Sequence, residues 1–199
     1  MSTRICPKCM AATDTRQCPD CRVPTVQDRG DSDQDPLLGS IFAERYKILD
    51  RLGSGGMGTV YRARHRMLQR PTAVKVLRDS QQPRAIARFE REVRLTAELT
   101  HPNTVQVYDF GRTDDGRFYY AMEYLPGLDL RSLIEVHGRQ PSDRVAHIVI
   151  QIAESLREAH GKGLVHRDIK AANVILCERG GRHDVVKVLD FGLVVALSE

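Results

Sequence analysis

The chain has 199 residues, 41% of them hydrophobic, which suits one medium-sized domain with a buried core and a small appendage. The formal net charge of +4 comes from 30 basic and 26 acidic residues that are mixed along the chain, so it indicates no nucleic-acid partner. The sequence contains neither the ~20 consecutive apolar residues that span a bilayer nor the apolar stretch of a secretion signal. We therefore expect a cytoplasmic protein without a membrane segment.

The first predicted element is a cysteine-rich head over residues 1–21. It contains two C-x-x-C pairs separated by eight residues, formed by Cys6, Cys9, Cys18 and Cys21. Each pair can offer two thiolates to one tetrahedral Zn²⁺, and so short a segment has too few apolar residues to fold otherwise. The gap between the pairs is shorter than in many zinc sites, so disulfides or unbound thiols stay open as the alternative. We expect a structural zinc in a head that resembles a minimal zinc ribbon.

Residues 22–40 are polar and acidic, with almost no apolar anchor. Such a segment cannot bury enough surface to offset the entropy of ordering it, which predicts a flexible linker. The remaining elements follow this linker.

Beyond the linker, apolar residues alternate with polar ones in short runs that are bounded by glycines and charged turns. The alternation predicts five strands of an antiparallel sheet, over residues 46–52, 59–65, 72–78, 104–110 and 117–124. Between the third and fourth runs, apolar side chains recur at helical spacing and predict one helix over residues 83–99, through Ile86, Phe89, Val93 and Ala97.

The pattern becomes helical after a hinge near residues 123–127. Ser142 and Asp143 can cap a helix that continues to Gly161, with an apolar stripe of Val145, Ile148, Ile152, Leu156 and Ala159. Residues 173–177 and 185–190 then predict a short β-hairpin. The predicted fold class is α+β, with a sheet-rich lobe, a hinge and an incomplete helical lobe.

Two features of the sheet-rich region point to phosphate. Gly53, Gly55 and Gly58 stand in G-x-G-x-x-G-x-V order between two predicted strands, where glycines let backbone amides approach phosphates. A plain glycine-rich hairpin is the alternative. Lys75 lies in an otherwise apolar strand, where a cation needs an anionic partner unless its ammonium reaches water at a sheet edge.

Two more specific motifs follow in the helical region. One has the pattern H-R-D-x-K-x-x-N and consists of His166, Arg167, Asp168, Lys170 and Asn173. The other is Asp190-Phe191-Gly192, which comes directly after an apolar run. All four motifs, in this order and at this spacing, make a chance coincidence remote.

With these motifs the chain resembles the protein kinases, and most of all the bacterial eukaryotic-type, or Hanks-type, serine/threonine kinases. The resemblance covers about residues 46–193 and implies a protein-kinase-like fold for a domain at residues 46–199. It implies an enzyme that uses ATP and Mg²⁺ to phosphorylate Ser and Thr hydroxyls of proteins in signalling. The serine/threonine preference is implied by Lys170, two residues after Asp168.

The resemblance also implies roles for single residues in catalysis. Lys75 would bind the α- and β-phosphates and would be oriented by Glu92. Glu90 lies ~200° from Glu92 on the helix and would be a solvated surface charge. Asp168 would accept the proton of the attacking hydroxyl, and Lys170 would offset charge on the transferring phosphoryl group.

Metal and nucleotide contacts are implied in the same way. Asn173 and Asp190 would supply oxygen ligands to Mg²⁺. Met122 resembles the residue that gates the adenine pocket, while Asp129 would either reach the ribose or only start a helix. The nucleotide-binding set is Leu52, Gly53, Ser54, Gly55, Gly56, Met57, Gly58, Val60, Lys75, Glu123 and Leu125.

In the family, an activation segment and further helices follow Asp-Phe-Gly, and this sequence has seven residues after Gly192. Two hypotheses follow: an active kinase, or a truncated, catalytically impaired module that binds nucleotide or scaffolds partners. A zinc-ribbon nucleic-acid binder is a third hypothesis, which the weak charge disfavours. We expect the isolated 199-residue chain to bind ATP weakly or not at all and to phosphorylate poorly.

Overall fold

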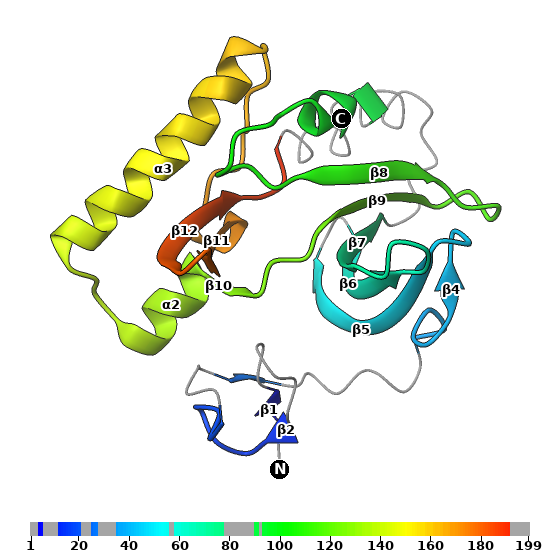
Figure 1. The fold of residues 1–199 in the computed structure, drawn as a ribbon, viewed down its shortest axis with the longest axis horizontal. Coiled ribbons are helices and arrows are strands. Elements are labelled where there is room, and N and C mark those ends of the chain that lie inside the picture. Colours follow the sequence, from blue (N-terminus) through cyan, green and yellow to red (C-terminus); the bar gives the residue numbers. More distant parts are fainter. Residues whose placement is uncertain are drawn as a thin grey trace.

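The structure is a computed structural model that describes residues 4–5, 12–20, 25–27, 35–55, 58–77, 90–91 and 93–191. Its largest unit is a six-stranded antiparallel sheet in the order β4-β5-β6-β7-β9-β8, which curls strongly (Figure 1). The strands are β4 (Ile41–Phe42), β5 (Tyr46–Gly55), β6 (Gly58–His65), β7 (Pro71–Leu77), β8 (Val107–Arg112) and β9 (Phe118–Glu123).

The five predicted strands are present, but the predicted count of five is wrong by one. The additional strand is β4, which pairs with the start of β5 so that Phe42 lies opposite Tyr46. Phe42 is buried, and its ring meets the Tyr119 ring edge to face with 5.2 Å between centroids. A two-residue strand shows no alternation, so the pattern could not reveal it, and the buried aromatic contact stabilises it instead.

The residues just before β4 also pack against the sheet. The Tyr61 hydroxyl donates to Asp35 Oδ2 at 2.8 Å. Leu37 and Leu38 pack against the buried cluster that contains Phe42. The range predicted to be a flexible linker, 22–40, therefore ends in an ordered turn at residues 35–40.

β7 lies in the middle of the sheet and is buried on both faces. Val74 and Val76 belong to the cluster that contains Phe42, while Ala73 and Leu77 belong to the cluster on the opposite face. Because side chains alternate along a strand, Lys75 projects to the face of Ala73 and Leu77.

A helix covers this second face. The helix predicted over residues 83–99 is confirmed in its described part, because residues 90–91 and 93–97 are helical. Val93 is buried and Ala97 partly buried against the cluster of Ala73 and Leu77. Ile86 and Phe89, which were predicted to share this stripe, lie outside the described residues.

The second lobe contains a small sheet and two helices. Its sheet has the order β10-β11-β12, and its helices are α2 and α3, with one turn of 3₁₀ helix, η2. The bounds are β10 (Gly127–Asp129), α2 (Leu130–His137), α3 (Ser142–Gly161), η2 (Ala171–Asn173), β11 (Val174–Arg179) and β12 (Arg182–Val188). The predicted hairpin and long helix are confirmed as β11–β12 and α3, whereas β10 was not predicted.

α3 runs alongside the β11–β12 hairpin (Figure 1). Of its predicted apolar stripe, Ile148 and Ala159 are buried, and Ile152 and Leu156 pack partly buried against the same cluster. Val145 is different, since 44% of it is exposed. The predicted cap is also wrong, because the N-cap position is Pro141 and no side chain caps the helix.

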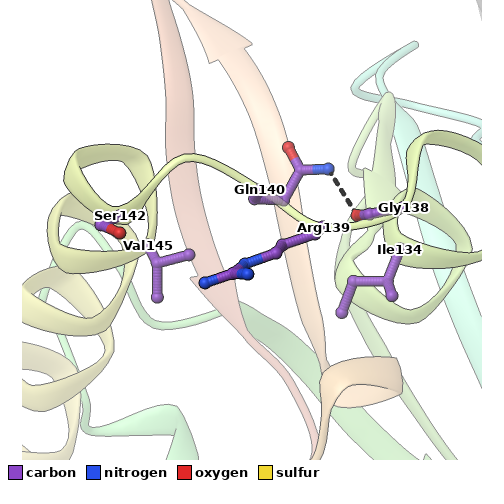
Figure 2. Close-up of a pocket in the computed structure, with 6 residues that line it drawn as sticks. All are labelled: Ile134, Gly138, Arg139, Gln140, Ser142 and Val145. Carbon is purple, nitrogen blue, oxygen red and sulfur yellow. Dashed lines mark hydrogen bonds between the residues drawn. The ribbon is translucent and has the colours of Figure 1, made fainter.

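A cavity of about 380 Å³ lies between α2 and the start of α3. Figure 2 shows Ile134 and Val145 on its two sides, with the Arg139 side chain between them. In the turn between the helices, Gln140 Nε2 donates to the Gly138 carbonyl oxygen at 2.9 Å. None of the lining residues belongs to the predicted catalytic or nucleotide-binding sets.

The cysteine-rich head contains a three-stranded sheet of β1 (Arg4–Ile5), β2 (Ala12–Thr13) and β3 (Val26–Gln27), in the order β2-β1-β3. β3 falls within the predicted linker. Cys18 is buried. The other predicted zinc ligands, Cys6, Cys9 and Cys21, lie outside the described residues.

The part of the chain that the structure describes contains no group of three or more His, Cys, Asp or Glu residues that could hold a metal. Over the same ranges, no helix is long and apolar enough to cross a membrane.

Candidate active site

The predicted phosphate loop is the β5–β6 hairpin, in which Gly55 pairs with Gly58. Its glycines serve different purposes. A Cβ on Gly58 would collide with the Val76 carbonyl oxygen, so this glycine is required by the close approach of β6 to β7. Among the described residues, a Cβ on Gly53 or Gly55 would meet nothing within 4 Å, which leaves room there for a phosphate.

The other residues predicted to bind nucleotide in and around this loop differ in how exposed they are. Leu52 is 46% exposed, and Val60 packs partly buried against the cluster of Ala73 and Leu77. Ser54 is exposed at the end of β5. Gly56 and Met57 lie outside the described residues, so their contacts with nucleotide stay predictions.

Lys75 and Asp190 meet although 115 residues separate them in the sequence. Lys75 Nζ donates to Asp190 Oδ2 at 2.6 Å, and the Tyr120 hydroxyl donates to Asp190 Oδ1 at 2.6 Å. The Lys75 side chain is 7% exposed and that of Asp190 23% exposed. Lys75 therefore has the anionic partner that a lysine inside a strand needs. That partner is Asp190, the carboxylate that was predicted to bind Mg²⁺.

Burial disfavours the charged form of Asp190, but the Lys75 charge and the hydrogen bonds from Lys75 and Tyr120 outweigh burial. The pKa of Asp190 consequently lies below its ordinary value, and the group is a carboxylate at neutral pH. Burial, with the neighbouring Asp190 charge, raises the pKa of Tyr120 well above its ordinary value. Tyr120 therefore remains a hydrogen-bond donor.

The predicted proton acceptor, Asp168, is held by two residues of its own loop. Lys170 Nζ donates to Asp168 Oδ2 at 2.6 Å, and Asn173 Nδ2 donates to the same oxygen at 3.0 Å. Asn173 Nδ2 also donates to the Asp168 backbone carbonyl at 2.9 Å. These bonds use both amide hydrogens of Asn173 and leave its amide oxygen as the group that can bind a cation.

Hydrogen bonds join this loop to the segment that carries Asp190. The Leu189 amide donates to the Asn173 carbonyl oxygen at 2.8 Å, and His166 Nε2 lies 2.7 Å from the Leu189 carbonyl oxygen. The His166 ring also contacts the buried Phe191 ring, with 4.7 Å between centroids. Arg167 and Asp190 both have positive φ, 63° and 54°, a strained conformation that is common at functional sites.

The predicted hinge follows β9. Met122 is buried in the cluster of Ala73 and Leu77, and Leu125 packs partly buried against it. The Glu123 side chain belongs to a buried ion cluster with two cations. Its Oε1 accepts from Lys187 Nζ at 2.6 Å, and its Oε2 accepts from Arg179. The Glu123 side chain is therefore not available to a nucleotide, and its backbone amide donates to the Gln106 carbonyl oxygen at 2.9 Å. A nucleotide contact at Glu123 stays a prediction.

Sequence reasoning missed this cluster and the contact of Tyr120. A local signal for Lys187 existed, since it interrupts an apolar strand in "VVKVL" just as Lys75 interrupts "AVKVL". Tyr120 had no such signal, because its partner depends on the pairing of distant segments.

Two further predicted residues, Asp129 and Glu90, lie within the described ranges. Asp129 caps α2, since its carboxylate accepts from the Ser132 amide at 3.0 Å and from the Ser132 hydroxyl at 2.7 Å, which favours the helix-start alternative. Glu90 is 3.8 Å from Arg112, as suits a surface charge. Glu92 lies outside the described residues, so its pairing with Lys75 stays a prediction.

This donor set suits Mg²⁺ bound together with a nucleotide. Mg²⁺ prefers oxygen ligands and usually takes only one or two carboxylates, with phosphates and water completing its shell. Asp190 offers a carboxylate and Asn173 an amide oxygen, on segments that the bond between Leu189 and Asn173 holds together. Lys75 contacts the Asp190 carboxylate, so the ammonium predicted to bind phosphate lies beside a predicted metal ligand.

Comparisons with known proteins agree with this site. The family model of the protein kinase domain matches residues 46–199. The chain is 40% identical over 163 residues to the serine/threonine-protein kinase pkn3 of Myxococcus xanthus, and 38% identical over 164 residues to the serine/threonine-protein kinase PrkC of Bacillus subtilis. Each match covers 81% of this chain but only 30% and 24% of the relatives, so the chain spans less than a third of their length.

A solved structure gives the same result. The crystal structure of the PknI kinase domain of Mycobacterium tuberculosis matches with a TM-score of 0.68 and 34% identity, over 78% of this chain and 62% of that one. Since the family model covers most of the sequence and the glycine loop, Lys75, Asp168 and Asp190 lie within it, the chain belongs to the protein kinase family.

Proposed function

We propose that this domain transfers the γ-phosphoryl group of ATP to serine and threonine hydroxyls of proteins. One observation carries the proposal: the loop that fixes Asp168 is hydrogen-bonded to the segment of Asp190, which in turn contacts Lys75. A proton acceptor, a metal carboxylate and a phosphate-binding ammonium are thereby held in one connected site. The relatives named as serine/threonine-protein kinases support the same reaction.

In this reaction the hydroxyl oxygen of the substrate forms a bond to the γ-phosphorus while the bond to the β–γ bridging oxygen breaks. Asp168 takes the hydroxyl proton, and the hydrogen bonds from Lys170 and Asn173 hold its carboxylate in place. Lys170 also offers its ammonium to the charge on the transferring group. Asp190 and Asn173 would hold Mg²⁺, which would supply neutralisation of the phosphate charge.

The experiment measures transfer of labelled γ-phosphate from ATP to peptides that differ only in having Ser, Thr or Tyr. We expect slow labelling of the Ser and Thr peptides, loss of that labelling in Lys75→Met, and a decrease of about 10² to 10⁴-fold in Asp168→Asn. Lys47→Met is the matched control, because Lys47 is an exposed lysine on β5 of the same sheet. Labelling that survives Lys75→Met would contradict the proposal.

A second candidate is a module that binds nucleotide without transferring phosphate. It is favoured by the direct contact between Lys75 and Asp190, in which the phosphate-binding and metal-binding groups satisfy each other. Binding of ADP by a chain that labels none of the peptides would support this candidate over the first.

For the head, we propose a structural zinc held by Cys6, Cys9, Cys18 and Cys21, in a cytoplasmic protein whose thiols stay reduced. The burial of Cys18 beside a sheet of two-residue strands supports this, because such short strands need a further cross-link. Metal analysis of the purified chain should give one zinc per molecule, and Cys18→Ser should lose it. A full zinc content in Cys18→Ser would refute the assignment.

A further inference from the structure

We propose that Tyr120 is a positioning residue for the metal carboxylate, and that its hydroxyl selects which oxygen of Asp190 is presented to Mg²⁺. The inference rests on the proposed function, because it concerns the metal that this function uses.

The two oxygens of Asp190 have different partners in the structure. Tyr120 donates to Oδ1 at 2.6 Å, while Lys75 donates to Oδ2 at 2.6 Å. Asp190 therefore has one neutral donor and one cationic donor, each assigned to its own oxygen. Of these two donors, only Lys75 has a further role in the proposed function, in which its ammonium binds the nucleotide phosphates.

The sheet holds Tyr120 firmly in this position. Tyr120 on β9 is the direct cross-strand partner of Lys75 on β7, so both side chains project from the same face. On its other side Tyr120 pairs with Phe110 of β8. The ring is 2% exposed and packs among the buried side chains of Ala73, Leu77 and their neighbours. A phenol packed in this way cannot turn to follow the nucleotide.

This difference in mobility decides how the carboxylate is oriented. Lys75 has a flexible four-carbon stem and can turn from Asp190 to a phosphate, and Oδ2 then loses its partner. The rigid Tyr120 keeps its bond to Oδ1 and prevents rotation of the carboxylate. Oδ2, on the partly exposed side chain, is then the oxygen available to the metal. Hydrogen bonds to a ligating carboxylate commonly change metal affinity 10 to 100-fold.

The test uses Tyr120→Phe, which removes the hydroxyl and keeps the ring. Tyr119→Phe is the matched control, since it removes the neighbouring hydroxyl on the opposite face of the same strand. Binding of a fluorescent ADP analogue is measured while Mg²⁺ is titrated, and again in EDTA. We expect Tyr120→Phe to raise the half-saturating Mg²⁺ concentration about tenfold, with unchanged ADP affinity in EDTA. Tyr119→Phe should match the unaltered chain in both measurements.

A double variant separates positioning from a general structural effect. In an Asp190→Asn background, Tyr120→Phe should cause no further shift, because the hydroxyl acts through that carboxylate. An unchanged or lower Mg²⁺ midpoint in Tyr120→Phe overturns the inference, as does an equal loss of ADP affinity in EDTA. If the unaltered chain shows no Mg²⁺-dependent binding of nucleotide, the proposed function fails and the inference with it. If Lys75-dependent transfer occurs and the Mg²⁺ midpoint does not move, only the inference fails.

Discussion

Replacing Lys187 by Met should lower the free energy of unfolding by about 3 kcal/mol. Lys187 and Glu123 face each other at 2.6 Å, and each side chain is only 6% exposed. Methionine has nearly the same length, so little packing is lost, but Glu123 is left as a buried carboxylate without this cation. Removal of one partner of a buried pair typically costs about 3 to 5 kcal/mol. The Arg179 and Gln106 contacts of Glu123 remain, which places the expected cost at the lower end.

Urea unfolding followed by circular dichroism measures this change, and a thermal melt provides a second reading. For a chain of this size 1 kcal/mol corresponds to roughly 2 to 4 °C, so the melting temperature should fall by about 6 to 12 °C. Lys47→Met, at an exposed position of β5, should stay within about 0.5 kcal/mol of the unaltered chain. A loss below about 1 kcal/mol in Lys187→Met would refute the reasoning.

The double variant Glu123→Leu with Lys187→Met tests the same ion pair by removing both of its charges. Exchange of a whole buried ion pair for apolar residues is often close to neutral, because both desolvation costs disappear. Arg179 can turn to water, since 44% of its side chain is already exposed. We expect the double variant to be more stable than Lys187→Met alone. A double variant that loses the sum of both single changes would show that Glu123 and Lys187 are not energetically coupled, and would contradict this expectation.

Further predictions concern single contacts. Gly127→Ala should cost about 1 to 3 kcal/mol in urea unfolding, because its Cβ would meet the Leu176 carbonyl oxygen and lie 2.8 Å from Ile175 Cγ2. Asp129→Ala should cost about 1 kcal/mol through loss of the α2 cap, and Asp129→Asn should restore most of it. Burial disfavours the charged form of Glu158, but its carboxylate accepts hydrogen bonds from the Thr100 and His101 amides and from the Thr100 hydroxyl. These bonds keep the pKa of Glu158 below its ordinary 4.5. The folded state thus favours the carboxylate, so its contribution is present above pH 4.5 and is lost as pH falls through the lower folded value. Acid titrations of unfolding should show a smaller pH dependence below 4.5 for Glu158→Gln, and an identical dependence would contradict this assignment.

Much of the site could be predicted because its signals are local. The order of Gly53, Lys75, Asp168 and Asp190 is written in short motifs, and each motif implies a residue type with a definite chemistry. The five long strands and α3 follow from periodicity, which depends only on neighbouring residues. β4 and β10 were missed because two or three residues show no period. Ser142 and Asp143 are residue types that often cap helices, but α3 already begins at Ser142, so both lie inside its first turn and no side chain caps it.

The sequence by itself determined which side chains carry charge, where the five long strands and α3 run, and which family the motifs resemble. The tertiary structure alone decided the partners. It brings Lys75 to Asp190 across 115 residues, places Tyr120 on the second oxygen of that carboxylate, and buries Glu123 against Lys187. These contacts depend on the register of strands that are distant in the chain, and a shift of one residue would turn every side chain to the other face. Local patterns contain no record of that register, because it is set by the packing of the whole core.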